Sequence, residues 1–126
     1  MKKIEHIGIA VKDLDVSNEL FEKLFGAPAY KFEEVQSEGV ITSFFHNGPN
    51  KIELLAATNP ESPIAKFIEK KGEGIHHIAF AVDDIESEIK RLKNEGFIVI
   101  FLMFTLREIL KNNEMGIKTQ NPTVTD

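Results

Sequence analysis

The chain has 126 residues, a formal net charge of −5 at pH 7 and a pI near 5.4. Its lysines are scattered, with no basic stripe and no interleaved aromatic residues, so nucleic acid is not expected as a partner. No apolar run of roughly 18 residues is present that could span a membrane, and the polar N-terminus is unlike a secretory signal. Because cysteine is absent, any metal must be bound by His, Asp or Glu, and a cytoplasmic location is expected.

The first half of the chain predicts one strand, one helix and three further strands. Residues 3–11 are rich in Ile and Val and favour a strand. Asp13 or Asp15 can cap the following helix, whose apolar residues recur at helical spacing and which Gly26 ends. The three further strands, separated by polar turn sequences, are expected at 30–35, 40–45 and 51–56.

The second half begins with a connector and a short helix over 64–71, which Ser62 caps and Pro63 opens. The later elements expected are a strand from residue 75, a helix over 84–94, an apolar strand over 97–104 and a helix over 105–114. Residues 116–126 are polar and are expected to fray.

Two stretches of the chain resemble each other. The first is Glu5-His6-Ile7-Gly8-Ile9-Ala10-Val11, and the second is His76-His77-Ile78-Ala79-Phe80-Ala81-Val82. Their alignment places His6 on His77, an offset of 77 − 6 = 71 residues. An internal repeat of this kind predicts two copies of one unit, each contributing one histidine to a shared centre.

Successive strand residues face opposite sides, so His76 and His77 cannot both enter one cavity, and the repeat selects His77. A buried imidazole needs a defined partner. Each histidine taken alone is more simply explained as a core residue bonded to backbone. The pairing of His6 with His77 by the repeat instead favours a common functional site.

Glu53 lies in the apolar strand sequence Lys51-Ile52-Glu53-Leu54-Leu55. Taken alone, it is better interpreted as an outward-facing residue of an alternating strand. Beside two histidines it becomes a candidate oxygen ligand, because two His and one Glu can bind a catalytic divalent ion and leave positions open for substrate. The remaining candidates are interpreted as exposed turn residues or helix caps: Glu33, Glu34, Glu38, His46, Asp83 and Asp84.

These residues resemble the vicinal oxygen chelate superfamily (glyoxalase I, extradiol dioxygenases, fosfomycin-resistance proteins), and within it the methylmalonyl-CoA epimerases. The likeness covers about residues 3–100. It is carried by the strand sequences around His6 and Glu53 and by the long run Ser62-Pro63-Ile64-Ala65-Lys66-Phe67-Ile68-Glu69-Lys70-Lys71-Gly72-Glu73-Gly74-Ile75-His76-His77-Ile78-Ala79-Phe80.

The resemblance implies an α+β fold of paired β-α-β-β-β modules, with the second module incomplete at its C-terminal end. The modules would be residues 1–58 and 74–126, joined by a linker with a short helix at 59–73, and the second would diverge from about residue 101. The implied cofactor is a divalent metal ion of the cobalt, zinc, nickel or manganese class. Its implied ligands are His6, Glu53 and His77, and the family resemblance also implies a homodimer.

The implied activity is metal-dependent epimerisation of methylmalonyl-CoA, an acyl-CoA substrate, by 1,1-proton transfer through a metal-stabilised enolate. A glyoxalase-like lyase or isomerase is an alternative within the superfamily. A non-catalytic metal-binding remnant is an alternative of another class.

The sequence departs from the family pattern at two places. After residue 100 it lacks the Val-Leu-Ile-Glu-Leu-like ending that carries a fourth ligand, so Glu108 and Glu114 are candidate replacements in sequence that predicts a helix. A truncation or a shifted reading frame near residue 100 would explain this change. The glutamate base of some family members falls at about Thr42, which leaves the catalytic base unassigned.

Overall fold

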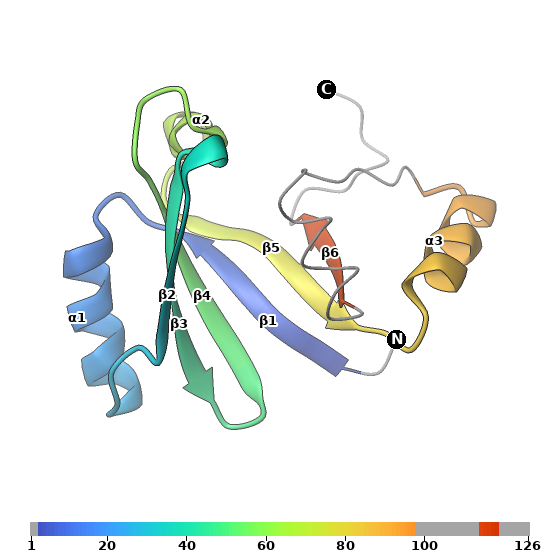
Figure 1. Cartoon of the computed structure of the whole chain (residues 1–126), viewed down its shortest axis with the longest axis horizontal. Coiled ribbons are helices and arrows are strands. Elements are labelled where there is room, and N and C mark those ends of the chain that lie inside the picture. Colours follow the sequence, from blue (N-terminus) through green and yellow to red (C-terminus); the bar gives the residue numbers. More distant parts are fainter. Residues whose placement is uncertain (1–2, 98–113, 119–126) are drawn as a thin grey trace. The chain divides into compact units, whose positions relative to one another are not determined.

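The computed structural model describes residues 3–97 and 114–118 (Figure 1). The strands are β1 (Lys3–Ala10), β2 (Lys31–Val35), β3 (Val40–Asn47), β4 (Asn50–Ala57), β5 (Gly74–Ala81) and β6 (Glu114–Lys118). The helices are α1 (Leu14–Phe25), α2 (Pro63–Lys71) and α3 (Ile85–Asn94), with a short 3-10 turn, η1, at Gln36–Glu38. The α+β class expected from the sequence is confirmed.

The chain divides into two compact units. One is His6–His76, and the other combines Met1–Glu5 with His77–Asp126. The modular division at 1–58, 59–73 and 74–126 stays a prediction.

The helix ends follow local chemistry, as the sequence predicts. Asp13 precedes α1, and its carboxylate accepts a hydrogen bond from the Val16 N–H at 3.1 Å, while Gly26 ends the helix in the left-handed region. Ser62 caps α2 with Pro63 at its first position, and Asp84 caps α3. Across the described part of the chain, every helix is too short or too polar to cross a membrane.

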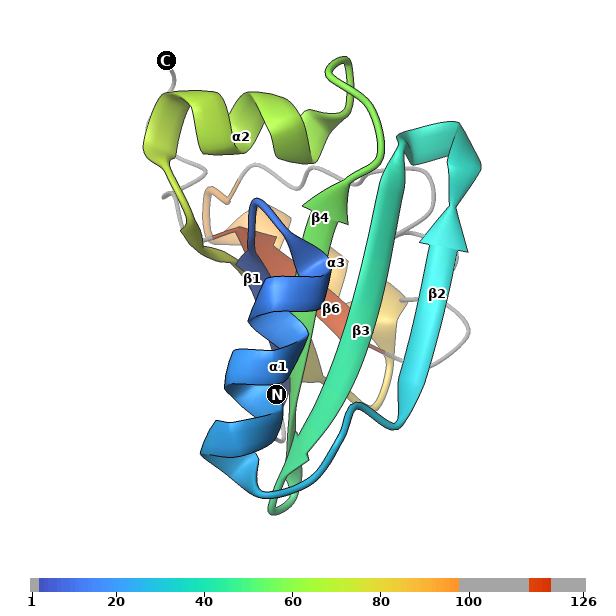
Figure 2. The same cartoon turned by 90° about the vertical axis from the view of Figure 1, so that its left-hand side faces the viewer.

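The His6–His76 unit contains a sheet with the strand order β2-β3-β4-β1 (Figure 2). β3 pairs antiparallel with β2 and β4, whereas β4 pairs parallel with β1. The register places Phe44 of β3 opposite Glu53 of β4, and Glu53 opposite Gly8 of β1. Directly paired residues share a face of the sheet, so this register determines which side chains lie together.

One face of this sheet packs against α1, as Figures 1 and 2 show. Its buried core cluster consists of Val11, Leu14, Phe45, Ile52, Leu54 and Ala56. The opposite face packs against α2 at one end, through a cluster of Ala10, Val40, Leu55 and Ile64. Beyond that apolar end, the second face carries the polar and aromatic residues of the candidate site.

Gly39 follows η1 with φ +62°, and a Cβ atom there would lie 2.6 Å from Asn59 Nδ2 and 3.1 Å from Ser62 Cβ. An alanine in this left-handed conformation costs about 1–2 kcal/mol. Crowding against the residue that caps α2 adds roughly 1–3 kcal/mol. Gly39→Ala should therefore lower the free energy of unfolding measured in urea by more than Gly48→Ala. Gly48 is the matched control because its φ is +61° and a Cβ there meets nothing within 4 Å. Equal losses in the two variants would contradict the crowding.

The other unit contains α3, β6 and the part of β5 that begins at His77. β5 pairs antiparallel with β6, with Ala81 opposite Glu114 and His77 opposite Lys118. Helix α3 buries Ile85 and Leu92 in a small cluster with Val82.

Two expectations for the end of the chain are wrong at residues 114–118. Glu114 was expected at the end of a helix and Gly116 at the start of a frayed tail, but both lie in β6. Met115 and Ile117 alternate with polar or small residues, which is the period of a strand. The apolar residues before them recur at helical spacing, and this pattern led to the prediction of a helix. The pairing with β5 stabilises the strand. The expected strand and helix between residues 98 and 113 lie outside the described residues.

Candidate metal centre

His6 and Glu53 lie on the same face of the His6–His76 sheet. In β4, Ile52 and Leu54 belong to the core beneath α1, so the intervening Glu53 faces the other way. Glu53 pairs with Gly8 in the parallel ladder, and His6 lies two residues before Gly8 on the same side. Strand alternation and one ladder therefore bring an imidazole and a carboxylate together.

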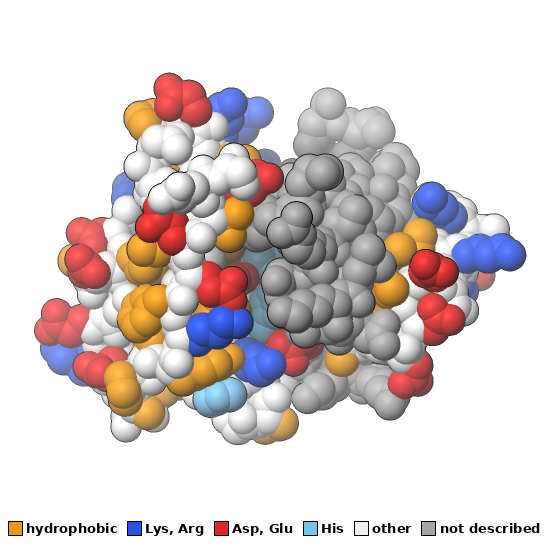
Figure 3. Space-filling model, viewed as in Figure 1, with side chains coloured by type: hydrophobic (Ala, Val, Ile, Leu, Met, Phe, Trp, Pro, Cys, Tyr) orange, Lys and Arg blue, Asp and Glu red, His pale blue; other side chains and the backbone are white. Residues whose placement is uncertain are grey.

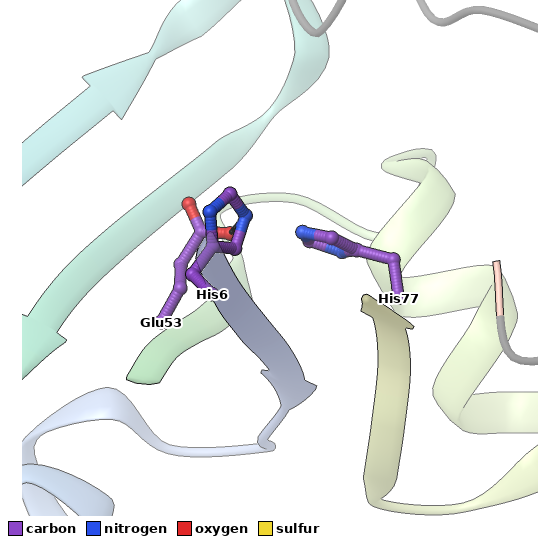
Figure 4. A group of neighbouring side chains, drawn as sticks. All are labelled: His6, Glu53 and His77. Atoms are coloured by element: carbon purple, nitrogen blue, oxygen red, sulfur yellow. Dashed lines mark ion pairs between the residues drawn. The ribbon is translucent and has the colours of Figure 1, made fainter. Parts of the chain in front are cut away.

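The functional groups of His6 and Glu53 lie close to each other. The distance from His6 Nε2 to Glu53 Oε1 is 3.6 Å, longer than a hydrogen bond. The side chains are 14% and 11% exposed. Two atoms bound tetrahedrally to one ion at about 2.0–2.2 Å lie roughly 3.3–3.6 Å apart. The donor types, spacing and burial therefore fit neighbouring ligands of one metal ion. Figure 4 shows this His6 ring beside the Glu53 carboxylate, and also draws the imidazole of His77 on β5.

The two adjacent histidines of β5 have different surroundings. His76 is 8% exposed, and its ring meets the ring of Phe67 edge-on at 4.9 Å between centroids. His76 is therefore a packed residue, as the alternation argument predicts. His77 points to the other side of β5 and is partly buried.

Several further residues share the sheet face of His6 and Glu53. Lys51 lies between His6 and His46 in register, and the His46 ring stacks on Tyr30 at 3.9 Å between centroids. His46 is exposed as expected, but it belongs to β3 and not to a turn.

Another part of this face combines a basic, an acidic and an aromatic side chain. Lys31 forms an ion pair with Glu33, and its ammonium lies 5.2 Å from the centre of the Phe44 ring. Figure 3 shows basic, acidic, histidine and hydrophobic side chains gathered along the sheet. No local sequence pattern predicts this group, because the strand register that brings its members together is a tertiary property.

The other candidate residues lie on different elements of the fold. Glu34 is exposed on β2, Glu38 lies partly buried in η1, and Asp84 caps α3. Thr42 is 3% exposed, and its hydroxyl donates a hydrogen bond to the Glu33 carbonyl at 3.5 Å. Glu108 lies outside the described residues.

Comparison with known families identifies the superfamily of this chain. A family described as the Glyoxalase/Bleomycin resistance protein/Dioxygenase superfamily matches residues 5–105. The chain belongs to this superfamily. The resemblance to vicinal oxygen chelate proteins inferred from sequence is therefore confirmed.

Relatives within the superfamily include methylmalonyl-CoA epimerases. A mitochondrial methylmalonyl-CoA epimerase of Dictyostelium discoideum is 37% identical over 99 residues, which cover 78% of this chain and 60% of that enzyme. An ethylmalonyl-CoA/methylmalonyl-CoA epimerase of Cereibacter sphaeroides is 36% identical over 99 residues, covering 78% of this chain and 74% of that enzyme.

Solved structures of the superfamily share the fold. A variant of the methylmalonyl-CoA epimerase of Streptomyces coelicolor, in complex with 2-nitronate-propionyl-CoA, is 29% identical with a TM-score of 0.72. The match covers 80% of this chain and 74% of that chain. The fold of this chain is thus one on which acyl-CoA epimerases are built.

Proposed function

We propose that the chain binds one divalent metal ion through His6, Glu53 and His77 and epimerises methylmalonyl-CoA or a closely related 2-substituted malonyl-CoA. Each of the three residues offers one ligand atom, an imidazole nitrogen or a carboxylate oxygen. The observation that carries the proposal is the His6–Glu53 pair, with its atoms 3.6 Å apart on a largely buried face. The similarity to the epimerases of Dictyostelium and Cereibacter supports the substrate class.

The reaction would invert the carbon between the carboxylate and the thioester, here called C2. A bound divalent ion supplies positive charge, which stabilises the negative charge that develops on the thioester oxygen when C2 loses its proton. His6 and Glu53 would hold their donor atoms in place through the β1 and β4 ladders. The core beneath α1 packs on the other face of this part of the sheet, and the low exposure of both side chains limits the access of water.

A metal-binding remnant without catalysis is the second candidate, and Thr42 is the observation that favours it. By the family resemblance, the glutamate base of some members falls at about this residue, and a buried hydroxyl cannot accept a proton at neutral pH. A glyoxalase-like activity rests on superfamily membership alone. The homodimer, the cytoplasmic location and the identity of the metal stay predictions.

Proton exchange at C2 tests the proposed function. Purified chain loaded with cobalt(II) or zinc(II) should exchange the C2 proton of methylmalonyl-CoA for deuterium in D₂O, as followed by proton NMR. Dialysis against EDTA should abolish the exchange, and addition of the metal should restore it.

The same assay separates the alternatives. Stoichiometric metal without C2 exchange would favour the remnant. Exchange that persists unchanged after complete removal of metal would contradict the metal-dependent mechanism.

A further inference from the structure

The sheet face of His6 and Glu53 holds one other carboxylate among the described strands β2, β3, β4 and β1. This is Glu33, which pairs with Thr42 of β3 and therefore faces the same way as Glu53. Its neighbour Glu34 faces the opposite side and is exposed. Of the two adjacent glutamates, only Glu33 is directed toward the candidate site.

An ion pair holds the Glu33 carboxylate over this face. Lys31 lies two residues before Glu33 on the same side of β2 and contacts it through its ammonium group. The same ammonium lies over the ring of Phe44, which is the direct cross-strand neighbour of Glu53. The contact with Lys31 therefore directs the Glu33 carboxylate toward the cross-strand row that contains Glu53.

The distances available allow Glu33 to reach a bound substrate. Neighbouring strands lie about 4.8 Å apart, and Glu33 lies two residues along the strands from the row of Glu53, so the Cα atoms of Glu33 and Glu53 are roughly 12 Å apart. A glutamate side chain extends about 4–5 Å. The remaining gap of roughly 7–8 Å leaves room for the C2 carbon of a substrate held next to Glu53. The side chain of Glu33 is 35% exposed, so it is accessible to a ligand on this face.

The other side chains near this position are less suited to accept a proton from carbon. Thr42 has only a hydroxyl, while Lys31 and Lys51 are cations. His46 is titratable, but it is exposed near the end of β3 with its ring stacked on Tyr30.

We propose that Glu33, which lies opposite Thr42 on the same sheet face as Glu53, exchanges the C2 proton on one face of the substrate. This inference rests on the proposed function. The Glu33 carboxylate accepts the proton as the C–H bond breaks, and the electron pair moves onto the thioester oxygen. Water donates a proton to the opposite face of C2. The resulting hydroxide then takes the proton from Glu33, so the cycle is balanced.

Glu33→Gln tests this assignment, with Glu34→Gln as the matched control on the same strand. Glu33→Gln should lower kcat for C2 exchange by about 10²–10⁴-fold. It should leave the metal content, the KM and the thermal melting temperature close to those of the wild type, because the amide preserves the shape and the metal ligands lie elsewhere. Glu34→Gln should exchange deuterium at the wild-type rate.

The outcomes distinguish this inference from the proposed function. Wild-type exchange with an equally active Glu33→Gln variant would overturn the role of Glu33 and leave the proposed function standing. Loss of exchange in His46→Gln together with full activity in Glu33→Gln would assign the proton to His46 instead. A metal-loaded wild-type chain without exchange would overturn the proposed function itself, and the role of Glu33 with it.

Discussion

Substitution of Glu53 by glutamine is expected to abolish stoichiometric metal binding and, with it, C2 proton exchange. The amide keeps the shape of the side chain but loses the negative charge that would neutralise the ion. Loss of a group that only orients a ligand already costs roughly 10–100-fold in metal affinity or activity. Loss of the ligand itself should therefore exceed about 100-fold in metal affinity, as measured by competition with a chromogenic chelator.

A matched control is Glu34→Gln, which makes the same chemical change at an exposed glutamate of the same sheet. It should bind metal as the wild type does. Metal affinity in Glu53→Gln within about threefold of the wild type would show that Glu53 is not a ligand, whatever the activity of the variant.

Phe45→Ala is expected to be the most destabilising single truncation in the His6–His76 unit. Phe45 is 1% exposed and is the largest fully buried side chain of the described residues. Its ring lies 6.1 Å from that of Phe21 and 5.9 Å from that of Phe25, between centroids, so it joins the sheet to α1. Truncation of a buried phenylalanine costs about 3–5 kcal/mol. Urea denaturation followed by circular dichroism should show this loss as a lower transition midpoint.

Phe32→Ala provides the control for this prediction, because Phe32 lies on β2 of the same sheet but is 59% exposed. Its truncation should change the free energy of unfolding by less than about 1 kcal/mol. Similar losses in both variants would mean that the aromatic cluster beneath α1 is not the main packing contact.

Local sequence signals predicted most of the helices and strands of the His6–His76 unit. Asp13 and Gly26 bound α1 as expected, and the pair Ser62-Pro63 begins α2. These signals can be recognised in the sequence because a capping residue bonds backbone groups of the adjacent helical turn, only a few residues away along the chain. Local signals did not predict the strand at Glu114, because this strand is defined by its pairing with Ala81, which is distant in sequence.

The candidate site was predictable in part for the same reason. The repeat selected His6 and His77, and an alternating strand identified Glu53 as a carboxylate in an apolar setting. The position of Glu33 opposite Thr42 follows from the register of β2 and β3, which no local sequence pattern predicts. Glu33, which the sequence predicts to be an exposed turn residue, therefore lies on the same sheet face as Glu53.

Anomalous diffraction from crystals of the cobalt-loaded chain, collected at the cobalt absorption edge, is the most direct test of the central claim. We predict one strong anomalous peak, about 2.0–2.2 Å from an imidazole nitrogen of His6, a carboxylate oxygen of Glu53 and an imidazole nitrogen of His77. A fully loaded protein whose peak contacts none or only one of these three side chains would contradict the account.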